Sequence, residues 1–77
     1  MDAYNAVRSA AGAAGVSLSE LGRRMGKPNN YVANGAARGS TPKADTLAAM
    51  LDACGWRLVA VPAGDVPASA LVIDPAR

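Results

Sequence analysis

The sequence predicts one small, mainly helical domain in which four helices are followed by two short β-strands. Alanine, the best helix former, supplies 18 of the 77 residues, whereas phenylalanine is absent. Glycines at 15, 26, 39 and 55 end four successive stretches with helical apolar spacing. Beyond residue 55 the composition changes, and two short segments are rich in aromatic and β-branched residues. We therefore expect a helical core of residues 1–55 and a C-terminal strand region of residues 56–77.

The first two helices have clear start signals. The first is predicted from Asp2, its N-cap, to about Ala14. The second opens after Ser17, because Ser17 and Glu20 match the S-x-x-E capping box, in which each side chain satisfies a backbone N–H of the other residue.

The third and fourth helices are predicted on either side of Gly39. Asn29 is the expected N-cap of the third, which runs to Arg38 with Gly35 in its middle, at a cost of about 1 kcal/mol relative to alanine. Thr41 and Pro42 fit the N-cap and first position of the fourth. The apolar stripe of that helix consists of Leu47, Met50, Leu51 and Cys54, and the cysteine is expected to be an inert core residue.

Residues 56–61 and 70–73 are predicted as strands separated by the loop PAGDVPAS. Both alternating sets of residues in the first strand are apolar, and a lone hairpin is marginal and leaves two open edges. Two alternatives follow: a hairpin packed on the helices, or strands that pair with those of a second copy. Trp56 is expected to plug the core where the last helix meets the strand. The predicted dimer interface consists of Trp56, Leu58, Val59, Val61, Leu71 and Ile73.

The charges are unevenly distributed along the chain. The net charge is +2, but residues 1–43 carry +4 and residues 44–77 carry −2. Five positive charges and no acid lie from Arg23 to Lys43. Such a basic stretch favours a polyanionic partner, with scattered, solvated surface cations as the alternative.

Several classes of protein are excluded by composition. With no histidine and one cysteine, the chain lacks the residues for a zinc finger, a disulfide framework, an imidazole base or a Cys/His dyad. No apolar run approaches the roughly 20 residues of a membrane helix, and the first residues lack the apolar region of a signal peptide. We expect a cytoplasmic protein that is not an enzyme and has no metal, cofactor or membrane partner.

The second and third predicted helices, joined by a tight turn, are typical of a helix-turn-helix. Leu21 and Met25 point one face of the second helix into the core, and Gly22 permits a close helix crossing. Val32 is expected to bury the inner face of the third helix.

Two segments carry a family resemblance. GVSLSELGRRMG is similar to G-[LV]-S-x-x-E-L-[AG]-x-x-[LM]-G, and YVANGAARGSTPKADTLAAML is similar to Y-V-S-x-x-x-x-x-G-x-x-P-x-x-D-T-L-x-x-[LM]-[LA]. Over about residues 5–62 the chain thus resembles the lambda-repressor/Cro-like helix-turn-helix family, also called the Xre family. P-K-A-D-T-L is its most specific part. The chain departs from the family at Leu18, where a DNA-contacting Gln is common, and at Gly35, which predicts a less rigid recognition helix.

The resemblance implies double-stranded DNA binding with the third helix in the major groove and the second across the backbone. Asparagine amides can read adenine, and an alanine can meet a thymine methyl. The predicted base-reading residues are Asn29, Asn30, Ala33 and Asn34, with capping as the alternative role of Asn29.

Phosphate contacts are expected near helix ends, where free N–H groups favour anions. The candidates are Ser17, Ser19, Lys27, Tyr31, Arg38, Ser40, Thr41 and Lys43. For Tyr31 the alternative is packing against the helices, and Arg38 could contact phosphate or base. Arg23 and Arg24 are ambiguous between DNA contact and solubility.

The expected function is therefore that of a sequence-specific transcriptional regulator. We expect a homodimeric repressor of phage or mobile-element type that binds a palindromic operator. The alternative is an antitoxin or adaptor module whose C-terminal strands bind a different protein, such as a toxin.

Overall fold

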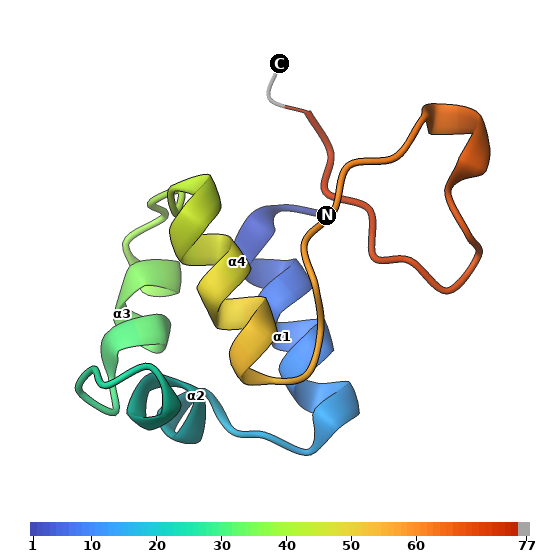
Figure 1. Ribbon diagram of the computed structural model, residues 1–77. Helices are drawn as coiled ribbons and strands as arrows, with labels where there is room; N and C mark the ends of the chain where they lie inside the picture. Colours follow the sequence, from blue (N-terminus) through green and yellow to red (C-terminus); the bar gives the residue numbers. More distant parts are fainter. Residues whose placement is uncertain (76–77) are drawn as a thin grey trace.

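The computed structural model describes residues 1–75, and these residues are mainly helical (Figure 1). The helices are α1 (Ala3–Ala14), α2 (Leu18–Arg24), α3 (Tyr31–Ala37) and α4 (Ala44–Ala53), followed by a 3₁₀ turn at Ala63–Asp65. The predicted helical class and the succession of four α-helices are confirmed within this part of the chain. Residues 76 and 77, which end the predicted strand region, lie outside it.

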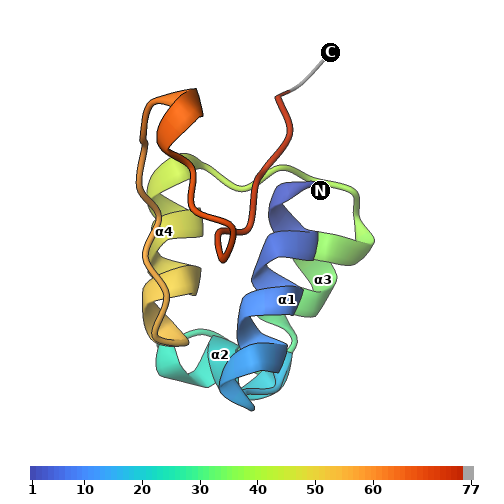
Figure 2. The ribbon, with the colours of Figure 1, turned by 90° about the vertical axis from the view of Figure 1, so that its right-hand side faces the viewer.

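The core lies between α4 on one side and α1 with α3 on the other, and α2 closes one end (Figure 2). All four helices contribute apolar side chains to it. Its buried members are Val7, Ala10, Leu21, Val32, Leu47, Met50, Leu51 and Cys54. The expected stripe of the fourth helix and the inward position of Val32 are therefore confirmed. None of the helices in residues 1–75 is long and apolar enough to cross a membrane.

The N-terminal ends of α1 and α2 are capped largely as expected. A carboxylate oxygen of Asp2 accepts from the Asn5 N–H at 2.8 Å, and Ser17 Oγ accepts from the Glu20 N–H at 3.1 Å. Only half of the capping box forms, because the Glu20 carboxylate accepts from Arg23 instead.

The predicted N-caps of α3 and α4 are wrong by one and two residues, respectively. Pro28 to Asn30 form a turn, in which the Tyr31 N–H donates to the Pro28 carbonyl at 3.0 Å, so α3 begins at Tyr31 and not after Asn29. The chain remains extended through Lys43, which has a ψ of 153°, and α4 begins at Ala44. Asp45 then lies in the first turn of α4, where the helix dipole favours a carboxylate.

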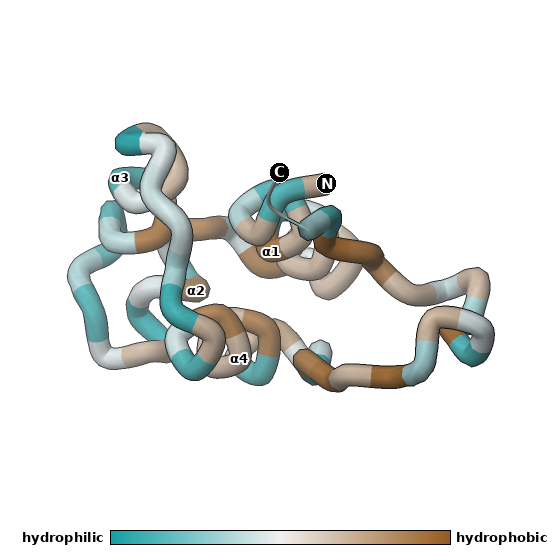
Figure 3. The backbone as a smooth tube through the Cα atoms, turned by 90° about the horizontal axis from the view of Figure 1, so that it is seen from above, coloured by the Kyte–Doolittle hydropathy of each residue, from teal (hydrophilic) through white to brown (hydrophobic). Residues whose placement is uncertain are grey.

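The predicted C-terminal β-hairpin is wrong: residues 56–75 contain no strand. They form an open loop beside the helices, and its two arms diverge around the 3₁₀ turn (Figure 3). Pro62 and Pro67 deprive the ends of these arms of backbone donors, and an isolated two-stranded ladder is marginal. The arms are held at their bases instead, where the Trp56 N–H donates to the Leu51 carbonyl and the Asp74 N–H to the Met1 carbonyl, both at 2.9 Å.

Candidate nucleic-acid interface

The turn between α2 and α3 brings these two helices into close contact. Gly22 is buried, and a Cβ atom at this position would lie only 2.7 Å from the carbonyl oxygen of Pro28. Gly26, with a φ of 72°, reverses the chain, and the Lys27 N–H then donates to the Gly22 carbonyl at 2.9 Å. The predicted need for a glycine at position 22 is confirmed, and the group that requires it is the backbone of the turn.

The inner side of α3 is packed onto α1 through Gly35. A Cβ atom on Gly35 would lie 2.9 Å from Cζ of Tyr4 and still closer to the Tyr4 hydroxyl oxygen. The Ser40 hydroxyl donates to the Gly35 carbonyl at 2.9 Å and so satisfies a group near the end of the helix. Gly35, expected to weaken α3, is thus the position at which α3 fits against its neighbour.

The outer side of α3 and the turn before it present the predicted base-reading residues. Asn29, Asn30, Ala33 and Asn34 are all exposed. Asn30 is the N-cap residue of α3 but makes no capping hydrogen bond through its side chain. Among residues 1–75, no side-chain hydrogen bond involves any of the three asparagine amides. The expected cap role of Asn29 is wrong, and all three amides can reach an external partner.

Two arginines of the basic stretch are occupied within the protein. Arg23 Nη2 lies 2.8 Å from a carboxylate oxygen of Glu20, and Arg24 Nε lies 3.4 Å from the other. Arg24 Nη1 also donates to the carbonyl of Ala53 at 3.0 Å and so links α2 to the C-terminal end of α4. The hydrogen bonds from Arg23 and then from Arg24 lower the pKa of Glu20. These contacts favour a structural role for both arginines.

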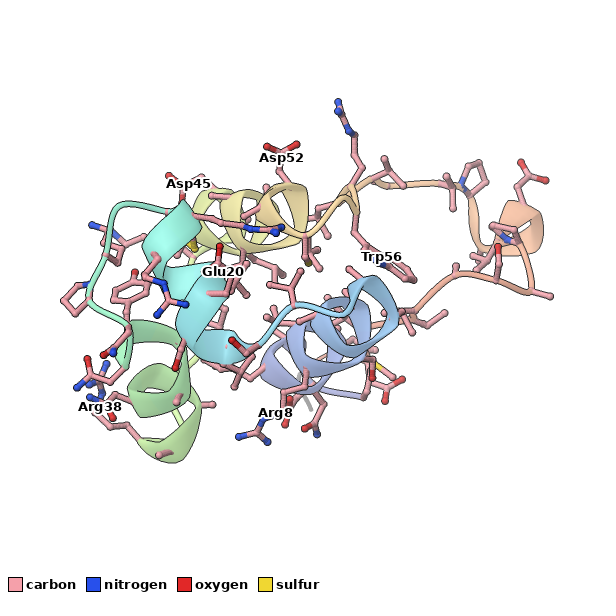
Figure 4. All side chains as sticks on the ribbon, turned by 90° about the horizontal axis from the view of Figure 1, so that it is seen from below. Arg8, Glu20, Arg38, Asp45, Asp52 and Trp56 are labelled. Atoms are coloured by element: carbon pink, nitrogen blue, oxygen red, sulfur yellow. The ribbon has the colours of Figure 1, made fainter. Side chains whose placement is uncertain are left out.

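The other cations of residues 1–55 have no carboxylate partner in the described part of the chain. They are Arg8, Lys27, Arg38 and Lys43. Figure 4 shows Arg8 and Arg38 projecting on the same side of the molecule, whereas Asp45 and Asp52 project from α4 on the opposite side. Arg8 and Arg38 thus project away from the carboxylates of α4, whereas Lys27 lines a surface pocket together with Asp45 and Asp52.

Arg8 is a residue that sequence reasoning does not select as a phosphate contact. It lies in α1, and no spacing in the sequence relates that helix to α3. The feature that could have identified Arg8 as a possible DNA contact is its exposed position on an amphipathic helix. The packing of α1 beside α3 brings it to the side where Arg38 projects.

The predicted phosphate-binding hydroxyls differ in what they already bind. Ser17 caps α2, and Ser40 donates to the end of α3. Ser19 and Thr41 are exposed, and their hydroxyl groups make no hydrogen bond within residues 1–75. Ser19 and Thr41 are therefore the hydroxyl groups that are free to bind a phosphate.

Tyr31 is half-buried and packs against the core. The Lys27 ammonium lies over its ring, with Nζ 5.5 Å from the ring centroid, within the range of a cation–π contact. The packing alternative for Tyr31 is confirmed, and its contact with phosphate stays a prediction.

The predicted dimer-interface residues fall into two groups. Trp56, Leu58, Leu71 and Ile73 are partly buried and pack against the core of their own chain. Figure 4 shows the indole of Trp56 turned toward α1, in agreement with its expected position as a core plug. Val59 and Val61 are exposed. The C-terminal loop thus presents apolar side chains both inward and outward.

No group of three His, Cys, Asp or Glu side chains within residues 1–75 is arranged to hold a metal ion. The single cysteine, Cys54, is buried, and burial raises the pKa of its thiol.

Comparison with protein-family models, with curated proteins and with solved structures gave no match. The case for a nucleic-acid interface therefore rests on the motif residues and on the geometry described above.

Proposed function

We propose that this protein is a helix-turn-helix transcriptional regulator that binds double-stranded DNA in a sequence-specific manner, with α3 in the major groove. The observation that supports this most directly is the set of three exposed asparagine amides at Asn29, Asn30 and Asn34, none of which has a partner within residues 1–75. An amide presents both a donor and an acceptor, and this pair matches the N7 and N6 edge of adenine.

The support of α3 favours readout of bases. Base contacts require a helix held in one position. The turn before α3 packs against α2 at Gly22, and α3 itself packs against Tyr4 at Gly35. The inner face, with Val32, is buried, so the outer face alone is free to enter a groove. A single α-helix matches the roughly 12 Å width of the major groove.

The charge distribution favours the same orientation. Lys27 precedes α3, while Arg38 and Lys43 follow it, and none of the three is paired with a carboxylate in the described part of the chain. Phosphate contacts on both sides of a recognition helix set its register on the duplex. Asp45 and Asp52 project on the side opposite to Arg38, and Lys27 lines a surface pocket with both of them.

The test starts with selection of bound sites from random DNA, followed by mobility-shift titrations of the selected site at several salt concentrations. Each phosphate contact adds about 0.9 to the slope of log K against log salt. We expect Lys27→Ala and Lys43→Ala each to lower that slope, and Asn34→Ala to reduce discrimination against base changes by about 1–3 kcal/mol.

Arg57→Ala is the matched control, because Arg57 is an exposed cation in the C-terminal loop. Its slope should equal that of the wild type. Absence of binding at low salt would contradict the proposal, and an unchanged slope in the two lysine variants would contradict the phosphate assignments.

The exposed valines of the C-terminal loop favour a second candidate function. An antitoxin or adaptor module would use such a surface to bind a different protein. A purified protein that is monomeric and does not bind DNA at low salt would favour this second function.

A further inference from the structure

Asn34 is the one asparagine of the chain that is followed by a glycine. Asn5, Asn29 and Asn30 precede alanine, asparagine and tyrosine. The side-chain amide of an asparagine can react with the backbone nitrogen of the next residue, and a Cβ atom on that residue obstructs the approach. Because Gly35 has no Cβ atom, the reaction meets the least steric hindrance at Asn34.

The reaction replaces the side-chain amide by an acid and needs water alone. The Gly35 nitrogen attacks Cγ of Asn34, the new N–Cγ bond closes a succinimide ring, and the Cγ–Nδ2 bond breaks. Ammonia leaves with the proton of the Gly35 N–H. Water then opens the ring at either carbonyl carbon and gives aspartate or isoaspartate. The net change is the uptake of water and the release of ammonia, without oxidation or reduction.

The two reacting groups have different surroundings in the folded protein. Asn34 is exposed, and its side-chain amide makes no hydrogen bond within residues 1–75. Gly35 is buried, and a Cβ atom there would lie 2.9 Å from Cζ of Tyr4. The amide is therefore free to move, whereas the attacking nitrogen belongs to a packed part of the helix.

The last turn of α3 fixes the peptide plane that joins these residues. The Asn34 carbonyl accepts from the Arg38 N–H at 3.1 Å, and the Gly35 carbonyl accepts from the Ser40 hydroxyl at 2.9 Å. Ring closure requires rotation about the Cα–C bond of Asn34, because the peptide unit itself is rigid. These hydrogen bonds must therefore break before the Gly35 nitrogen can reach Cγ.

The helix that carries this turn is a weak one. α3 has seven residues and includes a glycine, and its N-cap residue makes no side-chain hydrogen bond. Short helices are marginal by themselves, and helix ends open locally more often than the whole domain unfolds. Packing on Tyr4 and the hydrogen bond from Ser40 are the tertiary contacts that oppose this opening.

From these observations we propose that Asn34 is a site of spontaneous deamidation, which proceeds when the last turn of α3 opens and is slowed by the contacts of Tyr4 and Ser40 with Gly35. The product carries a negative charge on the face of α3 proposed to read DNA. A carboxylate has no N–H to donate to adenine and is repelled by phosphates. This consequence for DNA rests on the proposed function, whereas the reaction itself does not.

The test is peptide mapping by mass spectrometry of the full chain during incubation in mildly alkaline buffer without DNA. Cleavage after Arg24 and Arg38 gives a peptide in which Asn29 and Asn30 are internal controls for Asn34. In urea, Asn34 should convert at least about tenfold faster than either control, because a glycine follows it. Folding should slow the conversion of Asn34 by at least about tenfold.

Variants of the two contacts test what limits the reaction in the folded protein. Tyr4→Ala should accelerate conversion of Asn34 by about tenfold, and Ser40→Ala should accelerate it to a smaller extent. Tyr4→Phe is the matched control, since it keeps the ring and should convert at the wild-type rate. Circular dichroism shows whether each variant is folded, and Ser40→Ala decides the outcome if Tyr4→Ala does not fold.

Unchanged rates in Tyr4→Ala and Ser40→Ala would overturn the proposal, as would the absence of conversion at Asn34 in all of the folded proteins. An equal acceleration in Leu47→Ala, which weakens the core at α4, would show that conversion follows global unfolding and would overturn it too.

The consequence for DNA is measured separately. Asn34→Asp has the charge of the product and should bind the selected site at least about tenfold more weakly than the wild type. Equal binding would overturn the assigned consequence. Fresh wild type that binds no DNA would contradict the proposed function, while the conversion rates still decide whether Asn34 is the site.

Discussion

The phenol ring of Tyr4 in α1 lies against the bare Cα of Gly35 in α3, in space that the side chain of any other residue would need. This contact joins the first helix to the helix proposed to read DNA. It also explains why a residue unfavourable to helices stands in the middle of α3.

Gly35→Ala should destabilise the protein despite the better helix propensity of alanine. Propensity favours alanine by about 1 kcal/mol, whereas overpacking typically costs about 1–3 kcal/mol. In a Tyr4→Ala background the sign should reverse, because the obstructing ring is absent. Urea denaturation of the wild type, the two single variants and the double variant measures the effect of Gly35→Ala with and without the Tyr4 ring. Gly12→Ala is the control: Gly12 has open space around it in α1, so alanine should stabilise there. Stabilisation by Gly35→Ala with Tyr4 in place would contradict this account.

Gly22→Ala should destabilise the protein both in the wild type and in the Tyr4→Ala variant. The group that a Cβ would meet is the Pro28 carbonyl, and backbone cannot rotate away as the end of a side chain can. We expect a loss of about 1–3 kcal/mol in the free energy of unfolding, unchanged by Tyr4→Ala. Denaturation midpoints test this, and a loss that disappears with Tyr4→Ala would show that the strain lies elsewhere.

Acid should weaken the link made by Glu20. Hydrogen bonds from Arg23, and then from Arg24, lower the pKa of Glu20 in the folded state below its ordinary value of 4.5. A lowered pKa stabilises the folded state fully above the unfolded-state pKa, and this stabilisation is lost as the pH falls through the folded-state pKa. The free energy of unfolding should thus decline below about pH 4.5, and Glu20→Gln should show a smaller decline. Equal slopes in the two proteins would place the acid sensitivity at another carboxylate.

Arg8→Ala should weaken DNA binding without changing sequence preference. Arg8 projects on the same side as Arg38, and an added phosphate contact there would contribute about 0.9 to the salt slope. The measurement compares selected and altered sites at several salt concentrations. Both affinities should fall by the same factor, while thermal stability stays near that of the wild type, since Arg8 is exposed and has no carboxylate partner in residues 1–75. A change in base preference would instead make Arg8 a base-reading residue.

The local features of the helical core could be predicted because their causes lie within a few residues of one another. Asp2 and Ser17 cap the helices that follow them, and Gly15 and Gly26 adopt the left-handed conformation that ends a helix. The stripe from Leu47 to Cys54 follows from the helical repeat alone. The exposure of Asn30 and Asn34 on the outer side of α3 follows from Val32 being the buried position between them.

Other features depend on contacts between residues far apart in the chain. The role of Gly35 depends on Tyr4, the engagement of Arg24 depends on Ala53, and the position of Arg8 depends on how α1 packs beside α3. Residues 56–61 have the composition of a strand, but a strand needs a partner with matching hydrogen bonds. In the single chain Trp56 and Leu58 pack against the helical core, and residues 56–61 form no ladder.

The sequence alone thus determined where the helices lie and which of their faces are buried, because capping and periodicity act over one or two turns. The tertiary structure decided which cations and amides remain available and which apolar residues stay exposed, because both depend on which distant groups occupy the space around them.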